Sequence, residues 1–83
     1  MKTVAYSKTA SRMLLRMPRN EAARIRSKVD QYAADPASLV NQVKKLQGRP
    51  GFRLRVGDWR VIFDEDDQVV SIEEIGSRGS IYE

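Results

Sequence analysis

The fold of this chain is decided by Phe52-Arg53-Leu54-Arg55-Val56-Gly57-Asp58-Trp59-Arg60-Val61-Ile62-Phe63. Apolar and basic residues alternate over residues 52–56, which is the period of a strand with one buried face. Gly57-Asp58 is a two-residue connection with glycine first, as a type II′ hairpin turn prefers. The stretch therefore predicts two antiparallel strands whose register places Val56 opposite Trp59, Leu54 opposite Val61, and Arg55 opposite Arg60.

Two arginines face each other across this hairpin, on the side away from the apolar residues. Like charges directly opposite one another destabilise a sheet by up to about 1 kcal/mol. Such a pair indicates a surface that meets an anion, and guanidinium groups bind phosphate through paired hydrogen bonds. The hairpin therefore predicts a phosphate-binding face that contains Arg53, Arg55 and Arg60.

Length and missing residue types limit what the chain can be. Its 83 residues fit one domain, 1–83, and no apolar run is long enough for a membrane span or a signal peptide. The absence of cysteine excludes a disulfide framework and makes a cytoplasmic location the expectation. Without histidine or cysteine, zinc sites of the usual ligand types and Ser-His-Asp or Cys-His catalysis are excluded.

Acidic and basic residues are unevenly distributed along the chain. Residues 1–57 contain 13 Lys or Arg and 3 Asp or Glu, whereas residues 58–83 contain 2 and 8. A basic surface of this kind favours nucleic acid as a partner, with a merely solvated basic face as the alternative. The run Asp64-Glu65-Asp66-Asp67 is expected to be a solvated hairpin tip and not a metal site. Catalysis would then depend on Arg, Lys, Tyr, Ser and carboxylates, with no metal and no cofactor.

A strand and two helices are predicted before the hairpin. Lys2–Tyr6 has a weak strand pattern, and Ser7 is a suitable cap for a helix that Pro18-Arg19 ends. Asn20 is expected to cap a second helix, which Asp35-Pro36 ends. So short a break folds the helices back on each other. Helical spacing predicts a buried stripe on each of them, formed by Ala10, Met13, Leu14 and Met17 and by Ala22, Ile25, Val29 and Tyr32.

The remaining chain predicts a linker and a meander of strands. Residues 36–51 are expected to be the linker, and strands are expected at about 52–56, 59–64 and 69–75. A second turn at Asp66-Asp67 would place Arg60 opposite Glu73 as an ion pair. The predicted fold is an α+β domain in which an N-terminal strand and a helical hairpin pack on a twisted antiparallel sheet.

This pattern resembles the RelE/ParE superfamily of bacterial type II toxins over nearly the whole chain. The resemblance lies in Lys45-Leu46-Gln47-Gly48, in the stretch from Phe52 to Phe63, and in Ile75-Gly76-Ser77-Arg78-Gly79-Ser80-Ile81-Tyr82. Members of the RelE branch cut mRNA in the ribosomal A site and are neutralised by an antitoxin encoded beside them. The resemblance therefore implies a metal-independent endoribonuclease with a RelB-like antitoxin as partner in a hetero-oligomer.

Residues of this chain that match positions of the family's motif are expected to form its site. The resemblance implies catalytic roles for Arg53, Arg55, Arg60, Arg78 and Tyr82. Contacts to the RNA backbone are expected from Lys44, Lys45 and Arg49, as is common for basic side chains. Many relatives read Gly-His-Arg-Arg where this chain reads Gly76-Ser77-Arg78-Gly79. The first basic pair is arginine at both positions, and arginine stays charged, so it is a poor proton acceptor.

Two other functions fit the same fold. One is a ParE-like inhibitor of DNA gyrase, which binds its target and catalyses nothing. The other is a catalytically weak homologue whose basic face serves only to hold an antitoxin. Retention of all five site positions favours the RNase.

Overall fold

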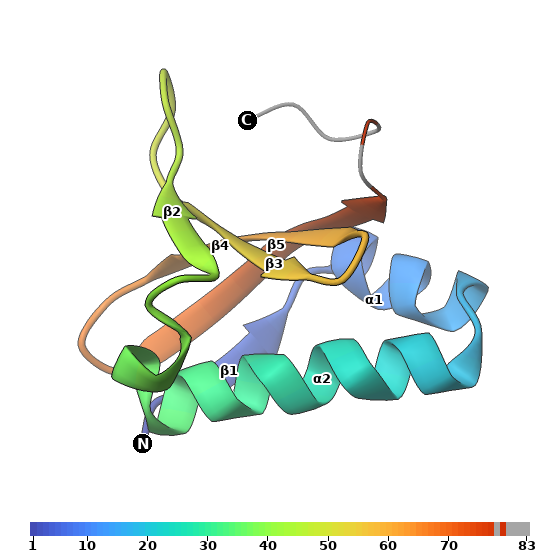
Figure 1. Cartoon of the computed structure of the whole chain (residues 1–83), viewed down its shortest axis with the longest axis horizontal. Helices are drawn as coiled ribbons and strands as arrows, with labels where there is room; N and C mark the ends of the chain where they lie inside the picture. Colours follow the sequence, from blue (N-terminus) through green and yellow to red (C-terminus); the bar gives the residue numbers. More distant parts are fainter. Residues whose placement is uncertain (78, 80–83) are drawn as a thin grey trace.

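The computed structural model describes residues 1–77 and 79, which form two helices beside one sheet (Figure 1). The elements in chain order are β1 (Thr3–Tyr6), α1 (Lys8–Arg16), α2 (Arg19–Ala34), a short 3-10 helix η1 (Pro36–Leu39), β2 (Val43–Lys45), β3 (Phe52–Val56), β4 (Trp59–Glu65) and β5 (Val69–Ser77). The strand order in the sheet is β1-β5-β4-β3-β2. The predicted α+β fold with the helices beside the sheet is confirmed.

The β3–β4 hairpin forms with the predicted register. Val56 pairs with Trp59, Arg55 with Arg60, and Leu54 with Val61. Gly57 has a φ of 59°, whereas no non-glycine residue in the described part of the chain has a positive φ. Asp58 therefore has a negative φ, as a type II′ turn requires at its second central position.

The sheet is mixed and not wholly antiparallel. Strands β2 to β5 form the antiparallel meander, but β1 lies parallel to β5 at the edge of the sheet. The stretch predicted to be only a linker contains η1 and the edge strand β2. At three residues, β2 is too short for its alternation to be recognised, and its pairing with β3 defines it.

The register between β4 and β5 differs from the predicted one. Glu65 pairs with Val70, so four residues lie between the paired positions where two were expected. The Asp66 carboxylate in this turn accepts hydrogen bonds from the amides of Gln68 (2.7 Å) and Val69 (2.8 Å). These bonds lower the pKa of Asp66. Farther along, the pairing shifts by one residue at a β-bulge between Ile62 and Phe63. The predicted Arg60–Glu73 pair is therefore wrong.

Both predicted helices are confirmed, with one correction at a cap. The Ser7 hydroxyl accepts a hydrogen bond from the amide of Ala10 at 3.0 Å and so caps α1. The N-cap of α2 is Pro18, not Asn20, because the fixed φ of proline suits the start of a helix and its carbonyl accepts the amides of Glu21 and Ala22. Within the described residues, neither helix is long and apolar enough to cross a membrane.

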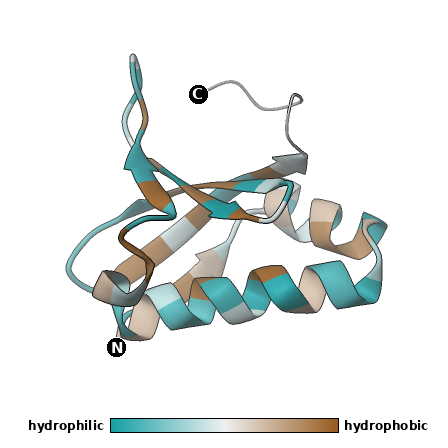
Figure 2. Ribbon diagram, viewed as in Figure 1, coloured by the Kyte–Doolittle hydropathy of each residue, from teal (hydrophilic) through white to brown (hydrophobic). Residues whose placement is uncertain are grey.

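The main core lies between the helices and one face of the sheet. Apolar and polar residues alternate along both layers, as Figure 2 shows by colour. Phe63 is 1% exposed, stacks on Phe52 with ring centroids 5.5 Å apart, and meets Tyr32 edge-on at 5.0 Å. Both predicted helical stripes face this core, with Ala22 and Met13 at its margin.

A hydrogen-bonded group joins three distant segments at one end of the core. The Tyr32 hydroxyl donates to Glu65 at 2.7 Å, and the Lys2 ammonium lies 3.1 Å from the other oxygen of that carboxylate. Burial and the bond to Glu65 raise the pKa of Tyr32. The group therefore ties the end of α2 to β4 and to the N-terminus.

Replacing Tyr32 with phenylalanine is expected to lower the free energy of unfolding by about 1.5–3 kcal/mol, the typical contribution of a hydrogen bond to a charged group. The raised pKa adds a pH dependence: this stabilisation is complete below about pH 10 and is lost as the pH rises further. Urea denaturation of the wild type and the variant, at pH 7 and above pH 10, measures the loss of unfolding free energy and its dependence on pH. Tyr6→Phe is the control, since the Tyr6 hydroxyl makes no hydrogen bond in the described part of the chain; equal losses in the two variants would contradict the assignment.

Candidate functional site

The sheet face opposite the main core carries the predicted arginines. In β3, Leu54 and Val56 belong to the core, so the alternating residues Arg53 and Arg55 point to the other side. Arg55 lies directly opposite Arg60 of β4. The structure therefore brings these three predicted catalytic residues together on one surface, called here the arginine face.

One row of the arginine face crosses four strands. Lys44 pairs with Arg53, Arg53 with Ile62, and Ile62 with Glu74. Ile62 is fully buried although it does not belong to the main core, so this row has an apolar residue at its centre. Arg53 beside it is only 7% exposed. A long side chain packed in this way loses little conformational freedom when it binds an anion.

The adjoining row holds Arg55, Arg60 and Gly76. The Nη1 of Arg60 donates to the carbonyl of Trp59 at 3.3 Å and reaches that of Gly57 at 3.5 Å. These contacts hold the guanidinium near the hairpin turn. Gly76 on the opposite strand is buried and contributes no side chain to this row.

Basic side chains continue from Arg53 onto β2. Lys44, Lys45, Gln47 and Arg53 line a pocket of about 290 Å³. Lys44 and Lys45, both predicted to contact RNA, are thus adjacent to a predicted catalytic residue. Gln47 had no predicted role, although it belongs to the Lys45–Gly48 motif.

Glu74 lies on the arginine face, where the sequence had predicted Glu73. The bulge makes Glu73 the extra residue and turns Glu74 toward the arginines, where it lies diagonally across from Arg60. Diagonal neighbours in a sheet are about 7–8 Å apart at the backbone, within reach of long side chains. Glu74 also lies 3.8 Å from Arg49, the third residue predicted to contact RNA. Both partners are partly exposed, so this pair adds only about 0–1 kcal/mol of stability.

Two predicted catalytic residues, Arg78 and Tyr82, lie outside the described residues.

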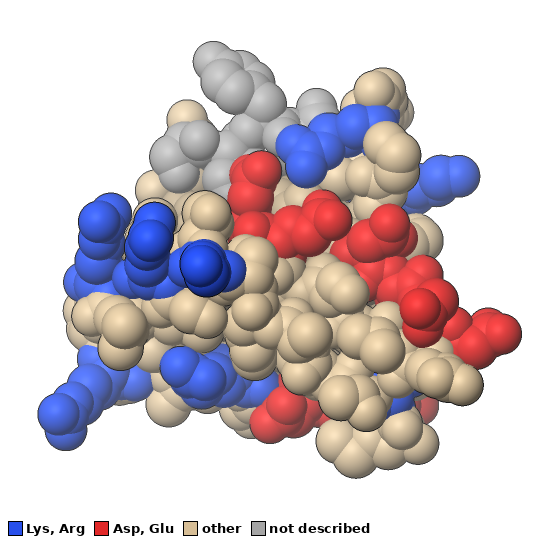
Figure 3. All heavy atoms as spheres, turned by 180° about the vertical axis from the view of Figure 1, so that it is seen from behind, with Lys and Arg blue, Asp and Glu red and all other residues tan. Residues whose placement is uncertain are grey.

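Charge is strongly segregated elsewhere on the surface. Seen from behind, acidic side chains form a band across the molecule and Lys or Arg side chains gather on both sides of it (Figure 3). Within the described residues, no group of His, Cys, Asp or Glu has the geometry to hold a metal ion. The arrangement can bind and polarise phosphate through guanidinium groups.

Comparison with known proteins gives one family match. The model for the ParE toxin of the type II toxin–antitoxin system parDE matches residues 4–82. No curated protein sequence matches the chain.

Solved structures of toxin–antitoxin complexes contain chains with the same fold. A chain of the archaeal RelE–RelB complex from Pyrococcus horikoshii is 27% identical, with a TM-score of 0.79 over 96% of this chain and 98% of that one. A chain of the RelBE2 complex from Mycobacterium tuberculosis is 26% identical, with a TM-score of 0.69 over 93% and 98%. A chain of the Escherichia coli DinJ–YafQ complex shares the fold at 18% identity, with a TM-score of 0.78 over 99% and 98%.

Proposed function

This chain belongs to the ParE toxin family, within the RelE/ParE superfamily of type II toxins, and we propose that it is a ribosome-dependent mRNA endoribonuclease. The observation that supports the proposal is the arginine face, where Arg53, Arg55 and Arg60 lie on the same side of two paired strands.

RNA supplies the nucleophile for the proposed reaction. The 2′-hydroxyl loses its proton and attacks the adjacent phosphorus, and the bond to the 5′-oxygen breaks. The leaving 5′-oxygen takes up a proton from water, so the products are a 2′,3′-cyclic phosphate and a 5′-hydroxyl. The transition state carries more negative charge on the phosphoryl oxygens than the ground state does. Preorganised donors aimed at those oxygens therefore accelerate the reaction.

The three arginines of the face have distinct proposed roles. Arg60 and Arg53 clamp the phosphoryl oxygens, because each is held by its surroundings and offers a planar pair of donors. Arg55 is exposed and adds positive charge opposite Arg60. Lys44, Lys45 and Arg49 bind the RNA backbone beside the reacting phosphate.

Two further catalytic roles are proposed for residues of the C-terminal segment. Arg78 neutralises the charge that develops on the leaving oxygen. Tyr82 stacks on an RNA base or orients the 2′-hydroxyl, as aromatic rings do with unstacked bases.

Glu74 is the proposed acceptor of the 2′-hydroxyl proton. Arg55 occupies the position that the resemblance suggests for this role, but a guanidinium does not release its proton in proteins. Glu74 is a carboxylate on the same face, one diagonal step from Arg60. A phosphate bound by Arg60 would therefore hold its adjacent 2′-hydroxyl near a group that can accept the proton.

The proposed partner is a RelB-like antitoxin that binds the toxin in a hetero-oligomer in the cytoplasm. The related structures from P. horikoshii and M. tuberculosis are toxin–antitoxin complexes, which supports this partnership. A partner with acidic side chains relieves the repulsion among the arginines when it covers their face.

Expression of the chain without an antitoxin is expected to stop bacterial growth and translation within minutes. Primer extension on a translated message should reveal new 5′ ends at codons in the ribosomal A site, and the same message with its start codon removed should stay intact. The Arg60→Ala variant expressed to the same level is the control. Intact messages together with loss of negative supercoiling would replace the RNase with a ParE-like gyrase inhibitor.

A further inference from the structure

Strand β5 is longer than the strand that covers one of its edges. Pairing with β1 ends at Tyr6 and Ile72, but β5 continues to Ser77. At the end of β1 the Ser7 amide donates to the carbonyl of Ile72 (2.8 Å), and the Ser7 hydroxyl donates to that of Glu73 (2.7 Å). In the described part of the chain, no strand pairs with this edge over residues 74–76. Such an edge is a template for another strand.

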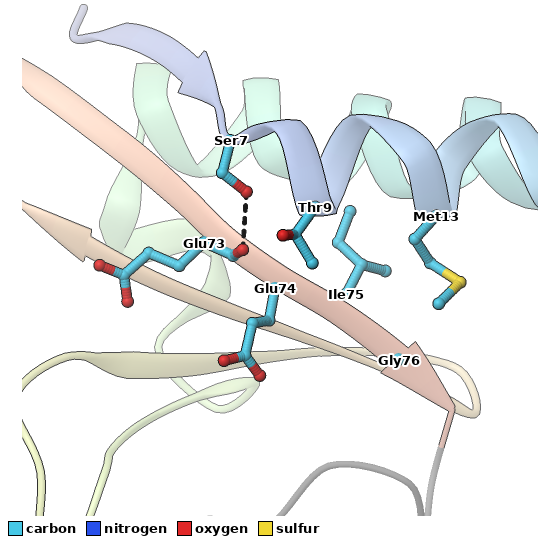
Figure 4. A pocket seen from close by; sticks show the side chains of 7 residues that line it. All are labelled: Ser7, Thr9, Met13, Glu73, Glu74, Ile75 and Gly76. Carbon is cyan, nitrogen blue, oxygen red and sulfur yellow. Dashed lines mark hydrogen bonds between the residues drawn. The ribbon is translucent and has the colours of Figure 1, made fainter.

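A groove of about 550 Å³ runs along this open edge, between β5 and α1. Ser7, Thr9 and Met13 line it from the helix side, and residues 73–76 line it from the sheet (Figure 4). Ile75 and Met13 both contact the main core, so they give the groove an apolar floor. The size is within the range of pockets that hold ligands.

The rim of the groove is acidic, although the protein as a whole is basic. Figure 4 shows the side chains of Glu73 and Glu74 pointing away from α1, along the outer margin of β5. Glu73 is exposed and forms no ion pair within the described residues. An occupant with a lysine or arginine at this margin would complement its charge.

We propose that this groove binds an extended segment of the antitoxin, which adds to the sheet beside β5 in line with β1. Backbone hydrogen bonds to residues 74–76 give the segment its direction, an apolar side chain contacts Met13 and Ile75, and a basic side chain approaches Glu73. Strand addition of this kind is a common mode of peptide recognition. The inference rests on the proposed antitoxin partnership and specifies where the partner binds.

The position of the groove links this contact to the arginine face. Gly76 and Glu74 line the groove and also belong to the two rows that contain Arg60 and Ile62. A segment bound along β5 therefore lies at the border of the proposed catalytic surface. The antitoxin could cover the arginines with a neighbouring acidic segment while this strand anchors it.

The test uses purified full-length toxin and the protein encoded by the adjacent reading frame. Thr9→Trp fills the groove from an exposed position on α1, and it is expected to weaken binding about tenfold or more. Leu15→Trp is the matched control, because Leu15 is 83% exposed and lies on a different side of the same helix. Glu73→Lys is expected to weaken binding several-fold at low salt and less at high salt, whereas Asp67→Lys at the β4–β5 turn should have little effect.

Amide exchange measured by NMR distinguishes strand addition from other contacts. On binding, one or more amides of residues 74–76 should exchange more slowly in the wild-type toxin. The inference is overturned if the wild-type toxin binds the antitoxin, the Thr9→Trp and Leu15→Trp variants bind it equally well, and the exchange rates of these amides do not change. The proposed function stands in that case. If the wild-type toxin binds no antitoxin, both the inference and the proposed partnership fail. If the groove instead joins two copies of the toxin while the antitoxin binds elsewhere, only the inference fails.

Discussion

Replacing Arg60 with alanine is expected to reduce RNA cleavage by about 10²–10³-fold, the usual cost of removing one preorganised donor from a charged transition state. The Nη1 of its side chain contacts the carbonyls of Trp59 (3.3 Å) and Gly57 (3.5 Å), which places the guanidinium beside the hairpin turn. Arg60→Lys keeps the charge but loses the planar pair of donors, and it should recover only part of the rate. Single-turnover cleavage on programmed ribosomes measures the chemical step.

Two controls separate catalysis from stability and from general charge. Arg12→Ala removes an exposed arginine of α1 and should leave cleavage unchanged. The melting temperature of Arg60→Ala should remain close to that of the wild type, because its side chain lies on the face opposite the main core. Wild-type cleavage by a folded Arg60→Ala protein would remove Arg60 from the site and the arginine face from the mechanism.

Replacing Glu74 with glutamine is expected to reduce cleavage by about 10²–10⁴-fold, the contribution typical of a general base. The amide keeps the size of the side chain but does not accept the 2′-hydroxyl proton. Single-turnover rates on programmed ribosomes measure this chemical step, in which the 2′-hydroxyl loses its proton and attacks the phosphate. RNA binding should change little, since the arginines and lysines that hold the phosphates remain.

Neighbouring positions provide matched controls for Glu74. Glu73→Gln changes the adjacent carboxylate, which is the extra residue of the bulge, and should leave the rate unchanged. Arg49→Ala removes the ion-pair partner at 3.8 Å but keeps the carboxylate, so any loss of rate should be modest. A large loss in Arg49→Ala that equals the loss in Glu74→Gln would mean that the pair positions the β2–β3 loop and that the proton leaves by another route.

Local patterns in the sequence determined the helices and the central hairpin. The alternation of Phe52, Leu54 and Val56 with arginines, followed by Gly57-Asp58, fixed both strands and their register, because a two-residue turn allows little choice of pairing. The Ser7 cap and the breaks at Pro18 and Pro36 set the limits of the helices to within two residues. The three arginines of the face followed from the same alternation, since successive side chains of a strand point to opposite sides.

Only the tertiary structure decided the edges of the sheet and the identity of the carboxylate on the arginine face. The parallel pairing of β1 with β5 joins residues more than 60 positions apart, and no local pattern reports such a pairing. The Glu73 carbonyl at the bulge accepts an equally distant hydrogen bond from Ser7, and the bulge moved Glu74 onto the arginine face. A strand has a period of two, so one extra residue reverses the side of every residue after it. The sequence by itself therefore determined which residue types form this surface, while long-range pairing decided which acidic residue joins them and, among the residues that the structure describes, left one edge of β5 without a partner strand over residues 74–76.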